Sequence, residues 1–425
     1  MAPTADAVAE EAEGEDTVGD GGALQGVRVL DLSGEPGQFC GKLMGDLGAE
    51  VIKIEPPTGD DVRQLGPFYA DVEDVNRSLY WHAMNTSKQA ITLNLETEKG
   101  RNLFRQLLPT TDIVLESYRP GTLERWGLGF GVLHQDYPHL ILTSITPCGQ
   151  TGPYRDLPAT DLEVMALGGF LATCGDPDRP PLRISVSQSD PFASLNAFTG
   201  SMLAYYHRLR GGTGQQVDVS MQECVTNLHY AQLNWHTYGI VTPRLGSTLL
   251  FGNYIPITFR CQDGYVQAIP MLSWEVFLPW MEEHDKLGDL ATPEWQERLQ
   301  TLATEWTQDQ VDYASQVVAD FLAGFTKSHL YEQAVQRRAL LYPVQNVRDC
   351  LEDRQLQARA YFVQVKSPAF EKPLTYPGAP FLMSVTPWHI RAPAPRLGEH
   401  NAAIYGDELG LSEAERATLQ HEGVI

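Results

Sequence analysis

The sequence lacks several features that define common protein classes. The 425-residue chain has no apolar run of about 18 residues, so it offers no membrane-spanning helix. Its six cysteines are scattered without a C-x-x-C pair, which is typical of reduced thiols in a cytoplasmic protein and excludes a disulfide framework and a zinc site. Basic residues number 31 against 54 acidic ones. The resulting net charge of −23 argues against a nucleic-acid or anionic membrane surface.

The motifs of several enzyme classes are missing as well. The first predicted turn between a strand and a helix, LSGEPGQFCG, has glycines at 34, 37 and 41. These glycines lack the G-x-G-x-x-G spacing that brings a pyrophosphate to a helix N-terminus, so we expect neither NAD nor FAD. The chain also contains no P-loop, no H-E-x-x-H and no G-x-S-x-G. No metal ligand set is predicted.

The N-terminus stands apart in composition. Residues 1–22 hold seven acids and no lysine or arginine. The segment lacks the aromatic and branched residues that would offset the entropy of ordering, so we expect a disordered acidic tail. It has neither the basic nor the apolar region of a signal peptide.

The rest of the chain predicts an α/β protein. Short β-branched runs alternate with helical patterns, which is typical of a doubly wound parallel sheet. The strands are expected at 26–34, 51–57, 89–95, 112–118 and 140–147, and the first helix at 41–50. A longer helix is expected at 193–210, followed by a glycine turn and a strand within 211–221. Because residues 231–330 change in character, we predict a large domain at 23–230, a smaller inserted domain at 231–330, and a return to the large domain at 331–425.

One short stretch raises the question of a catalytic carboxylate. In PATDLEVMALGGF (158–170), Asp161 stands where an apolar helical run begins. A short polar acceptor at that point is the usual signal of a helix cap, and the spacing alone favours this interpretation. Glu163 is expected to be a surface carboxylate.

Seven segments, in order along the chain, resemble the family III CoA-transferases, the group that includes formyl-CoA transferase, carnitine CoA-transferases and α-methylacyl-CoA racemase. The segments are GVRVLDLSG, DLGAEVIKIEPPTGDDVR, NTSKQAITLNL, ESYRPGTLERWGLG, SITPCGQTGPY, RLRGGTGQQVDVSM and APRLGEHNAAIYGDELGLSEAE. The resemblance implies a Rossmann-like large domain built from both chain ends, a small α+β domain between them, and an interlocked homodimer.

The resemblance also implies the chemistry. The family's catalytic carboxylate follows the G-Q-T-G-P-Y turn, and the matching residue is Asp161. An ionised carboxylate there attacks the acyl-CoA thioester and forms a mixed anhydride, and returning CoA then makes an aspartyl thioester that an acceptor acid consumes. Coenzyme A thioester is thus a substrate, and no permanently bound cofactor is implied.

Residues expected to bind CoA follow from the same resemblance. A phosphorylated nucleotide needs cations or helix N-termini. The basic positions of the pattern are Arg63, Lys88 and Arg125, and Gln38 matches an active-site glutamine in the first turn. The turn at Gly149 and Gln150 offers backbone amides near the carboxylate.

Two other activities stay open. One is an isomerase of the same family, either a racemase or an enzyme for intramolecular CoA transfer. A racemase is disfavoured because Thr160, not a histidine, precedes Asp161. The other is a CoA-binding subunit that works with a paralogous partner in a hetero-oligomeric CoA-transferase.

Overall fold

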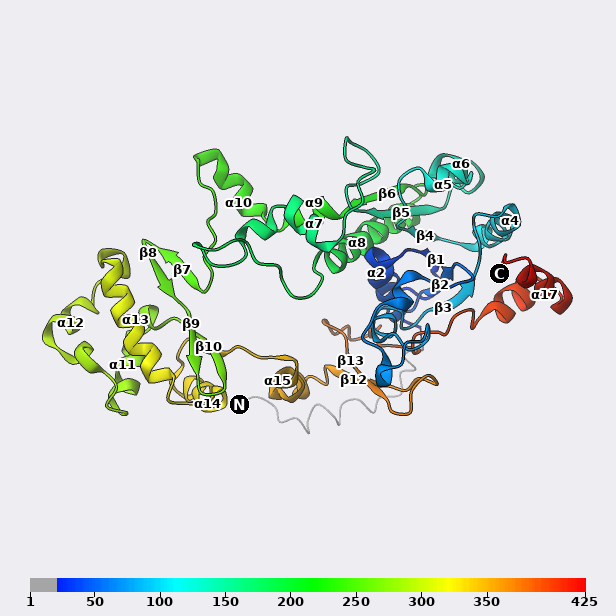
Figure 1. Cartoon of the computed structure of the whole chain (residues 1–425). Coiled ribbons are helices and arrows are strands. Elements are labelled where there is room, and N and C mark those ends of the chain that lie inside the picture. The colour runs from blue at the N-terminus through cyan, green and yellow to red at the C-terminus, as the bar shows by residue number, and fades with distance from the viewer. Residues whose placement is uncertain (1–20) are drawn as a thin grey trace. The chain divides into compact units, whose positions relative to one another are not determined.

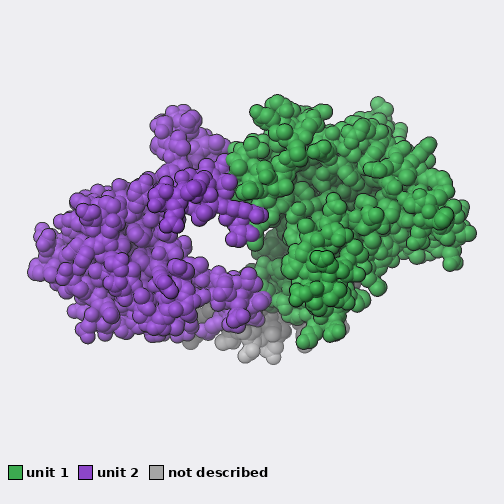
Figure 2. Space-filling model, viewed as in Figure 1, with its two compact units in different colours: residues 1–168, 186–228, 358–425 green, residues 169–185, 229–357 purple. Residues whose placement is uncertain are grey.

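The computed structural model describes residues 21–425, so nearly all of the predicted acidic tail lies outside the described residues. The chain divides into two compact units, coloured separately in Figure 2. The first unit contains the residues up to Gly168 together with Val186–Leu228 and Ala358–Ile425. The second contains Gly169–Ser185 and His229–Gln357. The domain boundaries expected from the sequence, at residues 230 and 330, stay a prediction.

A six-stranded parallel sheet forms the centre of the first unit, in the order β3-β2-β1-β4-β5-β6 (Figure 1). This confirms the prediction of an α/β fold with a parallel sheet. The strands are β1 (Arg28–Leu32), β2 (Glu50–Glu55), β3 (Gln89–Thr92), β4 (Ile113–Glu116), β5 (Ile141–Thr146) and β6 (Gln216–Ser220).

The strands are buried because helices cover both faces of a parallel sheet. Every residue of β4 and β5 is buried, and so are four of the five residues of β1. Leu30, Ile52, Ile91 and Val114 lie in one hydrophobic cluster of this unit. The unbroken apolar runs that predicted these strands are therefore the centre of the core.

The helices of the first unit connect the strands. They are α2 (Glu35–Asp46), α3 (Leu79–Met84), α4 (Glu98–Leu107), α5 (Thr122–Arg125), α6 (Phe130–Asp136), α7 (Asp161–Leu167), α8 (Ser189–Leu209), α9 (Met221–Asn227) and α17 (Glu413–His421). The prediction of the first helix at 41–50 was wrong at both ends. Proline at position 36 suits the first turn of a helix, and Gly48, with φ +105°, follows its end.

The second unit has its own hydrophobic core. A three-stranded antiparallel sheet, β11-β10-β9, packs with helices around Phe277, Trp280 and Phe321. The strands are β7 (Thr248–Phe251), β8 (Asn253–Pro256), β9 (Thr258–Cys261), β10 (Gly264–Ala268) and β11 (Leu341–Pro343). The helices are α10 (Tyr230–Trp235), α11 (Trp274–Glu282), α12 (Pro293–Arg298), α13 (Gln308–Leu322), α14 (Lys327–Arg337), α15 (Val347–Glu352) and α16 (Arg354–Ala358). The last residue of α16, Ala358, begins the C-terminal segment that belongs to the first unit.

The C-terminal segment returns to the first unit. It contains the hairpin of β12 (Phe362–Val365) and β13 (Leu374–Pro377), and the π-helical segment η10 (Ala402–Glu408) precedes α17. The last two residues, Val424 and Ile425, are buried in the same hydrophobic cluster as β1 and β2. The Asn94 backbone N–H donates to the Val424 carbonyl at 2.8 Å, so the chain end is fixed beside the segment that follows β3.

Within residues 21–425, no helix combines the length and the apolar character needed to cross a bilayer.

Candidate active site

The carboxyl edge of the sheet offers a position for a site. The strand order reverses between β1 and β4, and ligands of open α/β sheets bind where the order reverses. Helix α2 starts at this edge, directly after β1. The N-terminal part of α8 packs against it, because the Ser194 hydroxyl donates to the Pro36 carbonyl at 2.7 Å.

Asp161 is the first residue of α7 and is half-buried. The capping position belongs to Thr160, whose backbone N–H donates to the Glu163 carboxylate at 2.9 Å. Asp161 Oδ1 instead accepts hydrogen bonds from the start of α8: from the Gln188 N–H at 2.8 Å, the Ser189 N–H at 2.9 Å and the Ser189 hydroxyl at 3.0 Å. The interpretation of Asp161 as a plain helix cap was therefore wrong, since its carboxylate contacts a second helix.

Further acidic groups lie around this carboxylate. Asp190 is buried and accepts a hydrogen bond from the Ser187 hydroxyl. Burial raises the pKa of Asp190 to about 6, and the charges of Glu35 and Asp161 act in the same direction. The Tyr80 pKa is raised by burial, and the nearby carboxylates of Glu35, Asp190 and Asp161 act in the same direction. The ends of α2, α7 and α8 thus place three carboxyl groups and a phenol within electrostatic reach of one another.

Arg63 is fully buried and its guanidinium is occupied by protein groups. Nε and Nη2 donate to the two carboxylate oxygens of Glu55 at 2.6 and 2.8 Å. The guanidinium carbon also lies 3.6 Å from the ring centre of Trp81. This geometry is that of a structural ion pair, and the predicted CoA contact of Arg63 stays a prediction.

The structure brings Lys88 and Gln38 together. Lys88 Nζ donates to Asp31 Oδ2, to the Gln38 carbonyl and to Asn85 Oδ1, each at 2.8 Å. The Gln38 side chain is buried, and its Oε1 accepts from Asn85 Nδ2 at 2.8 Å. Gln38 Nε2 has no hydrogen-bond partner among residues 21–425. The two predicted CoA-binding residues therefore belong to one buried polar cluster beneath the site.

The other predicted CoA-binding residues lie on the far side of the sheet's switch point. Arg125 is exposed at the end of α5, where its Nη2 donates to Thr122 Oγ1 at 2.9 Å. Gly149 adopts φ +83°, and the next amide, the Gln150 N–H, donates to both carboxylate oxygens of Asp218 at 3.0 Å. That amide is therefore engaged by β6.

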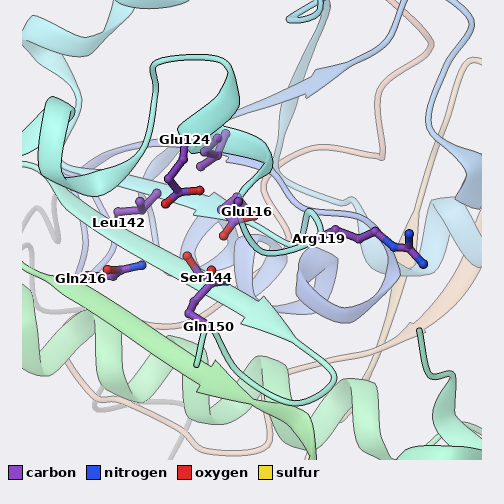
Figure 3. A pocket seen from close by; sticks show the side chains of 9 residues that line it. Glu116, Arg119, Glu124, Leu142, Ser144, Gln150 and Gln216 are labelled. Atoms are coloured by element: carbon purple, nitrogen blue, oxygen red, sulfur yellow. The ribbon is translucent and has the colours of Figure 1, made fainter. Parts of the chain in front are cut away.

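A small cavity lies against β4, β5 and α5 (Figure 3). Its lining includes Glu116, Glu124, Ser144 and Gln150, whereas the Arg119 side chain points away from the two carboxyl groups. Burial raises the pKa of Glu116 to about 7.

Sequence reasoning missed the donors on α8. Gln188 and Ser189 lie 27 and 28 residues beyond Asp161, and the intervening loop carries no periodic pattern. The one available signal was the Ser-Gln-Ser-Asp segment before an apolar helix, since such residues favour a helix start. In residues 21–425, no group of three or more His, Cys, Asp or Glu side chains is arranged to hold a metal ion.

Comparison with known proteins gives one consistent result. The family model described as CoA-transferase family III matches residues 24–401. The chain is 34% identical to a succinyl-CoA–D-citramalate CoA-transferase of Chloroflexus aurantiacus, over 95% of this chain and 98% of that protein. It is 32% identical to subunit BbsE of the succinyl-CoA:(R)-benzylsuccinate CoA-transferase of Thauera aromatica, over 94% and 97%. A solved CAIB/BAIF family protein from Brucella suis has a TM-score of 0.79 at 27% identity, over 91% of this chain and all of that one.

Proposed function

The chain belongs to CoA-transferase family III, and we propose that it moves CoA from an acyl-CoA thioester to a carboxylic acid through covalent intermediates on Asp161. One observation carries the assignment of the nucleophile. Asp161 is a half-buried carboxylate at the carboxyl edge of the sheet, held by three donors at the start of α8. A fixed carboxylate of this kind can attack a thioester without further reorganisation.

The proposed reaction balances without a net proton. Asp161 Oδ2 attacks the acyl carbon, the new C–O bond replaces the C–S bond, and CoA leaves as a thiolate from the mixed anhydride. The thiolate then attacks Asp161 Cγ, the Cγ–Oδ2 bond breaks, and the first acid leaves with that oxygen. The acceptor carboxylate reverses both steps, which regenerates the aspartate and forms the new acyl-CoA. Covalent catalysis thus divides one exchange into easier steps.

We propose that some of the predicted residues bind CoA directly and that the others support the site. Arg125 has an exposed guanidinium suited to a phosphate. Gly149 allows the close approach of a ligand to the backbone, since it has no side chain. Gln150 lines the adjoining cavity. The buried groups Gln38, Arg63 and Lys88 hold the neighbouring loops in position from below.

The acyl donor is proposed from the relatives. Two similar enzymes are named for succinyl-CoA, and this thioester is therefore the first donor to test. A panel of CoA donors against mono- and dicarboxylic acids, analysed by mass spectrometry, identifies the pair that turns over. Thioester migration or α-deuterium uptake without an acceptor acid would instead indicate the isomerase.

We also propose that the chain works as an interlocked homodimer. Exposed apolar side chains are numerous on α8 and on the segment around α10, where they would be covered by a partner. Examples are Leu203, Leu209, Tyr230 and Tyr238. Sedimentation of the purified chain tests the proposal, and a monomer with full turnover would contradict it. Because one relative is named as a subunit, co-purification with a paralogous chain is the other outcome to examine.

Trapping of the intermediate tests the nucleophile. Incubation with the active acyl-CoA and hydroxylamine should modify Asp161, and both Asp161→Ala and Asp161→Asn should lose turnover and adduct. Glu163→Gln is the matched control, because this exposed carboxylate lies two residues away and glutamine preserves its hydrogen bond to Thr160. An adduct on another carboxylate, such as the exposed Asp178 of the loop after α7, would move the chemistry to that residue.

A further inference from the structure

Three hydrogen bonds converge on one carboxylate oxygen of Asp161. Oδ1 accepts from two successive backbone amides and one hydroxyl, at 2.8 to 3.0 Å. The amides of Gln188 and Ser189 open the 21-residue helix α8, where N–H groups have no partner inside the helix. Three donors converging on one oxygen, at the positive end of a long helix, form the arrangement that stabilises a developing oxyanion.

We propose that the Ser189 hydroxyl is a catalytic group, which together with the Gln188 and Ser189 amides forms an oxyanion hole for the aspartyl carbonyl. This inference rests on the proposed function, because it assigns a role to Oδ1 only when Asp161 is the nucleophile. When the thiolate or the acceptor carboxylate attacks Cγ, the carbonyl oxygen Oδ1 takes up a full negative charge in the tetrahedral adduct. The electron pair returns to the carbonyl when the leaving group departs from Cγ.

The donors act unequally on the steps. In the free enzyme Oδ1 shares the carboxylate charge, and it loses charge when Oδ2 bonds to the acyl carbon. Donors to Oδ1 therefore give no help to the formation of the anhydride. They stabilise the later attack on Cγ, in which the charge on Oδ1 grows. Loss of one donor should thus slow the consumption of the covalent intermediate more than its formation.

The surroundings of Ser189 keep the donors in place. Ser189 is fully buried, and α8 is joined to the sheet where the hydroxyls of Ser201 and Thr143 lie 2.7 Å apart. On the other side of the first turn, Ser187 hydrogen-bonds to the buried Asp190. Donors fixed in this way need no reorganisation during the reaction, which is the source of their effect.

The test compares Ser189→Ala with the unaltered full-length protein, using the donor and acceptor pair that the panel identifies. Loss of one oxyanion donor typically lowers kcat by about 100-fold or more. We expect such a loss in kcat, little change in KM, and a larger fraction of the protein that carries the covalent Asp161 adduct at steady state, measured by mass spectrometry of the protein after an acid quench. Ser189→Thr, which retains a hydroxyl, should recover part of the rate. Thr199→Ala, which removes an exposed hydroxyl of the same helix, should keep kcat and the adduct fraction unchanged.

Two results would overturn the inference. One is a kcat for Ser189→Ala within twofold of the unaltered protein. The other is a lower kcat with an unchanged or smaller adduct fraction, which is the behaviour of a residue that only supports the fold. In both cases an adduct on Asp161 leaves the proposed function standing. Absence of any adduct on Asp161 in the unaltered protein would instead reject the proposed function itself.

Discussion

Substitution of the buried Arg63 tests whether this residue has a structural role or contacts CoA. Its guanidinium lies beneath the surface, paired through two hydrogen bonds with the equally buried Glu55. Further donors reach the carbonyls of Val75 and Pro395 at 3.0 and 3.3 Å. The perturbation is Arg63→Met, which keeps much of the side-chain volume and removes the charge.

The loss of stability in Arg63→Met can be estimated from the groups that lose their partner. In the variant, Glu55 is left as a buried carboxylate without its partner, and breaking a buried pair in this way costs about 3–5 kcal/mol. The contact with Trp81 adds about 0.5–2 kcal/mol when the cation is removed. We therefore expect Arg63→Met to lower the free energy of unfolding by about 5 kcal/mol. The double variant Glu55→Gln, Arg63→Met should lose less than the sum of the single variants, since no uncompensated charge remains.

The assay is urea unfolding of the full chain, with the first transition compared between variants, and KM for acyl-CoA measured at a temperature where each variant is folded. KM should stay near that of the unaltered protein. Arg63→Lys should not restore stability, because an ammonium cannot replace the two-pronged contact with the carboxylate. Unchanged stability with a strongly raised KM would refute the reasoning and establish Arg63 as a CoA ligand.

Three further predictions concern other sites. Glu116→Gln should raise the free energy of unfolding by up to about 3 kcal/mol at pH 8. The pKa of Glu116 is raised to about 7 in the fold, so the folded protein is destabilised by this carboxyl above pH 7. The destabilisation disappears as the pH falls from 7 toward the ordinary pKa of 4.5. An equal gain in stability of the variant at pH 4 and pH 8 would contradict this. Trp280→Ala, in the core of the second unit, should cost about 3–5 kcal/mol in thermal or urea unfolding. Gly149→Ala should cost about 1–2 kcal/mol because its φ is +83°, and unfolding curves like those of the unaltered protein would exclude this strain.

The sequence predicted the parts of the fold that depend on local patterns. Apolar β-branched runs marked five strands of the sheet, and the long apolar helix after residue 190 was found within a few residues. The first helix was placed too late because the glycines at 37 and 41 suggested a turn, whereas here they allow α2 to pack closely. A side chain added at Gly41 would meet the carboxylate of Asp31 at 2.3 Å.

The candidate site was predicted only in part. Asp161 was selected from the family resemblance, and its partners on α8 depend on a contact between distant segments that no single sequence reveals. The burial of the predicted basic residues could not be read from the sequence either. Lys88 and Arg63 look like ordinary surface cations, and only the fold shows that Asp31 and Glu55 are buried beside them.

The buried chain end has a consequence for how this protein is made. Val424 and Ile425 fill part of the core, and the Val424 carbonyl accepts a hydrogen bond from the Asn94 backbone. This hydrophobic cluster is therefore incomplete until Val424 and Ile425 have been synthesised, although most strands of the sheet lie in the first half of the sequence.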